Sequence, residues 1–160
     1  MNEEALLLSF LLGLGAFLFV FAVIGLICYV LLAMGLYTMA NNKGLENPWF
    51  AWVPILQFYI LGQIIEEMRF GNFEVPNVPV ALVVAAVAPA ILGTIPLIGW
   101  LISLASMVIL LYSLYLLFDK YSDNAVLKTV LSVVLPFLGP IFVFMMRNES
   151  PNSTIDSINV

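Results

Sequence analysis

Charged side chains are confined to short stretches of this chain, and the long ranges between them are apolar. Residues 5–42, 47–65, 75–118 and 129–146 contain no Asp, Glu, Lys or Arg. A charge at the centre of a bilayer costs about 2.5 to 3.5 kcal/mol on insertion scales, so long charge-free apolar ranges are typical of membrane-embedded segments. The pattern predicts an all-α fold, that of a polytopic helical membrane protein.

Glycine, proline and polar residues divide these ranges into shorter apolar segments. We expect five of them, at about 5–40, 49–65, 79–95, 100–118 and 126–146. Together they form a single integral membrane domain over residues 1–147, followed by a polar tail, 148–160, that we expect to be disordered. Four to five transmembrane helices are predicted, with Pro-broken or re-entrant segments among them.

The first segment is too long for a simple crossing. As a helix, residues 5–36 would extend roughly 48 Å at 1.5 Å per residue, against a hydrocarbon core of about 30 Å. This helix is therefore expected to tilt, bend or protrude.

The second segment begins with Trp49 and Trp52, which suit the headgroup region of a bilayer. Pro54, Gln57 and Gln63 weaken it as a lipid-facing span. It either crosses the membrane or enters and returns on the same side.

Proline also interrupts the later segments. Range 75–118 is too long for one helix and is predicted to form a helical hairpin that turns at Pro96 to Trp100. The last segment contains Pro136 and Pro140, so it either kinks strongly or folds back before crossing.

The prolines lie in a short recurring pattern. Pro54-Ile-Leu-Gln57, Pro96-Leu-Ile-Gly99 and Pro136-Phe-Leu-Gly139 share two apolar residues after proline and then Gln or Gly. One interpretation is a three-fold repeat of bent apolar elements. The other is that proline is simply frequent in membrane helices.

The cations bear on orientation, because Lys and Arg near span ends favour the cytoplasm. If 49–65 is re-entrant, four crossings place Lys43, Arg69, Lys120 and Lys128 in the cytoplasm and both termini outside. If the last proline pair also folds back, Arg147 and the tail join them inside. Five simple crossings fit the rule poorly.

Composition supports the membrane assignment and excludes other classes. The chain is 63% hydrophobic and 9% charged, whereas soluble domains are roughly 25% charged. Five scattered cations form no basic patch, so we expect no nucleic-acid partner. The single Cys28 supports no intramolecular disulfide and no structural zinc site.

Recognisable catalytic motifs are missing from the sequence. It contains no His, no Gly-x-x-x-x-Gly-Lys phosphate loop and no Gly-x-Ser-x-Gly elbow. Glu66 and Glu67 are interpreted as acids at the membrane edge rather than as a protease motif. We expect no catalytic residue, no cofactor and no metal site.

Residues 48–147 resemble uncharacterised small polytopic membrane proteins of bacteria, especially Gram-positive ones. The resemblance is carried by Trp49 to Gly62 with its Trp-x-x-Trp-x-Pro motif, by the Pro-containing stretch Ile95 to Trp100, and by Tyr115 to Tyr121. It implies a multi-pass location in a cell membrane, the cytoplasmic membrane if the chain is bacterial. It implies no activity.

Three functions follow in order of preference. The first is a non-catalytic accessory or scaffold subunit of a membrane complex, which binds the lipid bilayer and a membrane-protein partner or a second copy. The second is a small transporter, channel or lipid-handling protein that uses the Pro-broken helices. The third is an intramembrane enzyme. The candidate interface or cavity residues are Trp49, Trp52, Pro54, Gln57, Gln63, Pro96, Trp100, Pro136 and Pro140.

Overall fold

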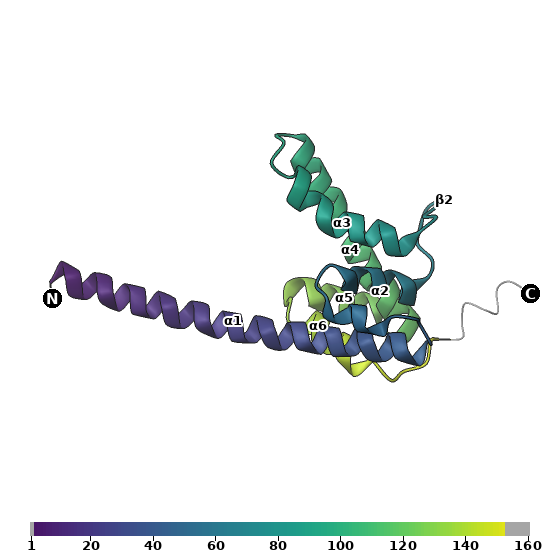
Figure 1. The fold of residues 1–160 in the computed structure, drawn as a ribbon, viewed down its shortest axis with the longest axis horizontal. Coiled ribbons are helices and arrows are strands. Elements are labelled where there is room, and N and C mark those ends of the chain that lie inside the picture. Colours follow the sequence, from purple (N-terminus) through teal and green to yellow (C-terminus); the bar gives the residue numbers. More distant parts are fainter. Residues whose placement is uncertain (1, 153–160) are drawn as a thin grey trace, which may run out of the picture.

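The computed structural model describes residues 2–152, and this part of the chain is mostly helical (Figure 1). A long helix, α1 (Glu3–Asn42), leads to a 3₁₀-helix, η1 (Pro48–Trp52), and to α2 (Leu56–Ile65). Two short antiparallel strands, β1 (Arg69–Phe70) and β2 (Phe73–Glu74), precede α3 (Val78–Leu92) and α4 (Ile98–Tyr121). The described part ends with α5 (Ala125–Val134) and α6 (Leu138–Met145). The predicted disorder of the tail falls mostly on residues 153–160, which lie outside the described residues.

Two helices, α1 and α4, are long and apolar enough to cross a membrane. In the most apolar 18-residue stretch of α1, only 6% of the residues are buried inside the protein, and in that of α4 only 22%. Their apolar side chains therefore face outward, which favours contact with lipid over a place in a soluble core. The predicted count of four to five transmembrane helices is not supported, because α2 and α5 have 10 residues each and α3 has 15.

Proline explains why the other helices are short. Pro54 lies between η1 and α2, and Pro136 lies between α5 and α6, so two predicted segments are each split into two helices. Range 75–118 forms the expected hairpin of α3 and α4. Its turn lies at residues 93–97 rather than at the predicted Pro96 to Trp100, because α4 already begins at Ile98. In this turn the Ile98 amide donates to the Pro96 carbonyl at 2.7 Å, and Leu97 has a φ of 64°. The bond spans a three-residue γ-turn.

The ends of the later helices return to the end of α1. The side-chain amide of Asn42 donates to the Arg147 carbonyl at 3.1 Å, so α6 ends beside the end of α1. The backbone amide of Asn152 donates to the Lys120 carbonyl at 2.7 Å. The charged loops therefore gather at one end of the molecule, and the N-terminus of α1 lies far from them (Figure 1).

The helices form two arms that meet at a common core. α1 packs on α6 and α3 packs on α4, and α2 contacts α1, α3 and α4. The two pairs, which we call the α1–α6 arm and the α3–α4 arm, diverge away from the charged end (Figure 1). The core lies near their junction and includes Leu36, Met39, Ile60, Ile64, Leu82, Leu117 and Phe118. Residues 3–27 of α1 extend beyond it and are all exposed.

Candidate functional site

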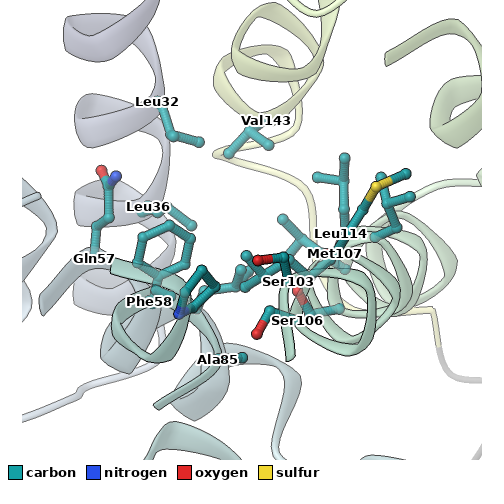
Figure 2. A pocket seen from close by; sticks show the side chains of 17 residues that line it. Leu32, Leu36, Gln57, Phe58, Ala85, Ser103, Ser106, Met107, Leu114 and Val143 are labelled. Atoms are coloured by element: carbon teal, nitrogen blue, oxygen red, sulfur yellow. Dashed lines mark hydrogen bonds between the residues drawn. The ribbon is translucent and has the colours of Figure 1, made fainter. Parts of the chain in front are cut away.

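An apolar cavity of about 500 Å³ lies between the two arms (Figure 2). Leu32 and Leu36 of α1 and Val143 of α6 line one side, and Phe58 of α2 lies next to them. Met107 of α4 also lines the cavity and is 56% exposed, so the cavity reaches the molecular surface. Its size lies within the range of about 300–1,000 Å³ that is common for ligand pockets.

Four polar side chains line this cavity: Gln57 of α2 and Ser103, Ser106 and Ser113 of α4. The Ser103 hydroxyl donates to the Gly99 carbonyl at 2.8 Å, and Ser113 donates to the Leu110 carbonyl at 2.7 Å. Their protons are therefore used within α4. The side-chain oxygen of Gln57 is buried and accepts no hydrogen bond from any described residue.

Pro89 alters the hydrogen bonding of the helix that forms one wall of the cavity. It lies inside α3, where its missing N–H removes the usual intrahelical donor to the carbonyl four residues earlier. That carbonyl belongs to Ala85, and both residues line the cavity. Proline in a membrane helix is tolerated where neighbouring groups or a water-filled cavity compensate the freed carbonyl.

The chemistry of the lining restricts what the cavity can hold. None of its lining residues carries a charge. A buried carboxylate or phosphate would therefore be unpaired, and burying an unpaired ion is very costly. The cavity is suited to a neutral, mainly apolar molecule.

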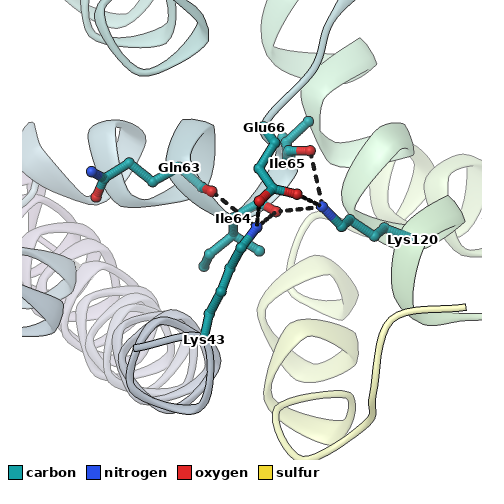
Figure 3. A network of polar contacts seen from close by, with 6 residues as sticks. All are labelled: Lys43, Gln63, Ile64, Ile65, Glu66 and Lys120. Carbon is teal, nitrogen blue, oxygen red and sulfur yellow. Dashed lines mark hydrogen bonds and ion pairs between the residues drawn. The ribbon is translucent and has the colours of Figure 1, made fainter. Parts of the chain in front are cut away.

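A cluster of Lys43, Glu66 and Lys120 lies at the charged end, where the two arms meet (Figure 3). Lys43 follows α1, and its ammonium group lies 2.6 Å from the Glu66 carboxylate. Lys120 of α4 binds the other oxygen of the same carboxylate. One acid thus joins a lysine from each arm.

Both lysines also bind the C-terminal end of α2. Lys43 donates to the carbonyls of Gln63 and Ile64 at 3.3 and 3.0 Å. Lys120 donates to those of Ile64 and Ile65 at 3.2 and 3.3 Å. Cations are favourable at this end of a helix because its last carbonyls lack intrahelical partners. The cluster therefore fixes α2, which lines the cavity with Gln57 and Phe58.

The environment of the cluster shifts two pKa values. Burial lowers the pKa of Lys43 below its ordinary 10.5, and the nearby Lys120 charge adds to this, while the bond to Glu66 opposes it. Burial alone would raise the pKa of Glu66. Hydrogen bonds and charges from Lys120 and Lys43 outweigh that effect, so the pKa of Glu66 lies below its ordinary 4.5.

The structure brings one of the nine residues singled out in the sequence, Gln57, to the cavity. Gln63 contributes its backbone carbonyl to the lysine contacts instead. Trp49 and Trp52 lie on η1 and are 55% and 41% exposed. The other five are at turns or near helix starts outside the cavity lining: Pro54, Pro96, Trp100, Pro136 and Pro140.

Two parts of the site were not anticipated from the sequence. Ser103, Ser106 and Ser113 are spaced by three and seven residues, so their helical positions share one face, and this signal was present in the sequence. The Lys43–Glu66–Lys120 cluster was missed, because it joins residues from three loops and helix ends. Glu66 is therefore a paired group and not simply a solvated acid at the membrane edge.

No protein-family model, curated protein or solved structure matches this chain. Within residues 2–152, no group of three or more His, Cys, Asp or Glu side chains is arranged to hold a metal ion.

Proposed function

We propose that the chain is a non-catalytic integral membrane protein that binds a lipid-like molecule in the cavity between its two arms. The observation that carries this proposal is the uncharged cavity of about 500 Å³, which reaches the surface beside exposed apolar residues of α4. A molecule dissolved in the bilayer could enter such a site without crossing water. Within the functions considered from the sequence, this is a lipid-handling role.

The proposed topology has α1 crossing the membrane once and three hairpins entering from one side. These hairpins are η1 with α2, α3 with α4, and α5 with α6. Support comes from the cations, because the loops and helix ends that carry Lys43, Arg69, Lys120, Lys128 and Arg147 gather at one end of the molecule. The positive-inside rule makes this end cytoplasmic and leaves the N-terminus outside. The resemblance of residues 48–147 adds the proposal of a bacterial cytoplasmic membrane.

Lipid retained after mild purification tests the binding proposal. Ala86 lines the cavity, so Ala86→Leu should fill part of it and reduce the retained lipid several-fold in native mass spectrometry. Ala90→Leu makes the same change at an exposed position of α3 outside the lining and should have no effect. Equal retention by both variants, or no retained lipid in the unaltered protein, would contradict the proposal.

Accessibility labelling tests the topology. In a Cys28→Ala background, single cysteines at Asn77 and Asp123 flank the α3–α4 hairpin and should label from the cytoplasmic side. A cysteine at Asn2 should label from the opposite side. Labelling of Asn77 and Asp123 from different sides would contradict the hairpin in the membrane.

The accessory or scaffold role remains a second proposal, and the length of α1 favours it. Its 40 residues extend about 60 Å, roughly twice the hydrocarbon thickness, and residues 3–27 are all exposed. A helix with so much unpaired apolar surface is suited to contact another membrane protein. A stoichiometric partner that copurifies with the full chain, and is lost on deletion of residues 3–20, would support this role.

A further inference from the structure

We propose that the cavity binds an uncharged lipid with a carbonyl oxygen among its apolar carbons, and that the Ser106 hydroxyl donates a hydrogen bond to this oxygen. This inference rests on the proposed function, since it requires the cavity to bind a ligand at all. It goes further in naming the chemistry of the recognised group and the side chain that recognises it.

Ser106 differs from the other serine and threonine side chains on the described helices. Each of the other six donates its hydroxyl proton to a carbonyl three or four residues earlier on its own helix: Ser9, Thr38, Ser103, Ser113, Thr129 and Ser132. The Ser106 hydroxyl makes no such bond and has no hydrogen-bond partner among residues 2–152. Ser106 is only 5% exposed, so a buried hydroxyl with a free proton lies in the cavity wall.

The Ser106 hydroxyl is also within reach of a ligand. Ser106 lines the cavity from α4, as Ala85 does from α3 (Figure 2). Among the described residues that are not exposed, the Gln57 oxygen is the one unpaired side-chain polar atom that is closed to water. The equally unpaired Ser106 oxygen is therefore open to the cavity that it lines.

The free polar groups of the lining favour a hydrogen-bond acceptor on the ligand. The protons of Ser103 and Ser113 are used within α4. The side-chain nitrogen of Gln57 is a second free donor, but Gln57 lies at one edge of the cavity and is less buried than Ser106 (Figure 2). A site with a buried polar group discriminates against an analogue that leaves this group unpaired. A carbonyl needs only a donor, whereas a carboxylate would also need a cation, and the lining has none.

The depth of Ser106 separates this ligand from the phospholipids of the bilayer. Fifteen residues of α4 separate Ser106 from Tyr121 at the charged end, which corresponds to about 22 Å. In the proposed topology, Ser106 therefore lies inside a hydrocarbon core of about 30 Å, whereas the ester groups of phospholipids lie near its boundary. The recognised carbonyl must be one that the ligand carries among its apolar carbons.

Binding of dioctyl ketone and heptadecane, which have equal numbers of carbons, to the full-length protein in nanodiscs tests the inference. Corrected for partition into empty nanodiscs, the ketone should bind about tenfold more tightly than the hydrocarbon. With carbon-13 at the carbonyl, the infrared C=O band of the bound ketone should lie at lower frequency than in empty nanodiscs. Ser106→Ala should abolish the preference and the band shift while both probes still bind. Ser103→Ala removes a hydroxyl whose proton is already bonded and should leave both intact.

The outcomes separate this inference from the proposed function. Equal binding of ketone and hydrocarbon to the unaltered protein would overturn the inference and leave lipid binding standing. An unshifted band of the bound ketone, or a preference that persists in Ser106→Ala, would overturn the role of Ser106. If neither probe binds, the inference and the proposed function both fail. The comparison of the two probes and the band shift need only the unaltered protein, so they decide the inference even if Ser106→Ala does not fold.

Discussion

Helices α2 and α3 approach each other closely at Gly62, and a methyl group there should separate them. A Cβ built on Gly62 would lie 2.5 Å from the Pro79 Cα, 2.6 Å from the Pro79 nitrogen and 3.0 Å from the Val78 carbonyl carbon. All three are backbone atoms, so no side-chain rotation can relieve the contact. Gly62→Ala therefore requires a shift of α2 or α3 as a whole.

The size of the effect follows from two opposing contributions. Ordinary contacts of a Cβ lie at 3.4–4 Å, so the helices must separate by about 1 Å at this point. Overpacking of this kind typically costs 1–3 kcal/mol. Replacing Gly by Ala inside a helix also contributes up to about 1 kcal/mol of stabilisation. Gly25→Ala measures this second contribution alone, because nothing lies within 4 Å of its Cβ position.

We expect Gly62→Ala to be less stable than Gly25→Ala by about 1–3 kcal/mol. Reversible unfolding in mixed micelles, followed by tryptophan fluorescence, measures the difference. Gly35→Ala should fall between them, since its Cβ would meet the Val143 side chain at 2.9 Å and backbone at 3.0 Å. If Gly62→Ala proves as stable as Gly25→Ala, the close packing of α2 on α3 is wrong.

The Lys43–Glu66–Lys120 cluster gives two further predictions. Glu66→Gln should destabilise the protein by about 1–2 kcal/mol. A fully buried pair would contribute more, but the Glu66 side chain is 55% exposed, so solvent screens its two ion pairs. Glu67→Gln, which removes only an exposed pair with Arg69, should cost less than about 1 kcal/mol, and equal effects would contradict the assigned role of Glu66. Because the pKa of Glu66 is lowered in the folded protein, its contribution is present above pH 4.5 and is lost as the pH falls through that lowered value. Unfolding measured between pH 6 and pH 3 should therefore show a smaller acid-dependent loss of stability in Glu66→Gln than in the unaltered protein.

The sequence was informative about location because charge carries a large cost in a bilayer. Charge-free ranges predicted the apolar helices, and glycine and proline predicted the α3–α4 hairpin. The predicted number of crossings is not supported because it counted apolar segments rather than helices. Pro54 and Pro136 each end one helix and start another, so a segment long enough to span becomes two short helices. Hydropathy averaged over a segment cannot detect such a break.

The site was less predictable because it depends on contacts between distant residues. Gln57 was identified as the polar exception in an apolar run, and it does line the cavity. The sequence shows a proline at position 89, but only the structure shows that Pro89 and Ala85 both line the cavity. Glu66 meets Lys43 and Lys120, which are 23 and 54 residues away along the chain. Nothing in local sequence pattern indicates which of several loop charges will pair.

The recurring proline pattern has a structural counterpart. A bend, two turn residues and the start of a helix occur at residues 53–56, 95–98 and 135–138, where α2, α4 and α6 begin. Each of these helices is the returning half of one hairpin. The interpretation as a repeat is thus favoured over chance proline frequency, because a turn followed by a helix start accompanies each sequence match. The second turn differs in backbone conformation, since Leu97 has a φ of 64° whereas Ile55 and Phe137 are in the right-handed helical region.

The repeated turn meets the physical requirement of a chain that reverses inside a membrane. The first amides of a helix lack intrahelical partners, and none of these three helices has a side-chain cap. The turn itself supplies the acceptors. The Gln57 amide donates to the Val53 carbonyl at 2.9 Å, and the Gly99 amide donates to the Ile95 carbonyl at 2.7 Å. At the third turn the Leu138 amide donates to the Leu135 carbonyl at 2.9 Å. Backbone polar groups at membrane depth must be satisfied within the protein. In the proposed topology, each proline turn therefore gives an acceptor to at least one of the first amides of the helix that follows it.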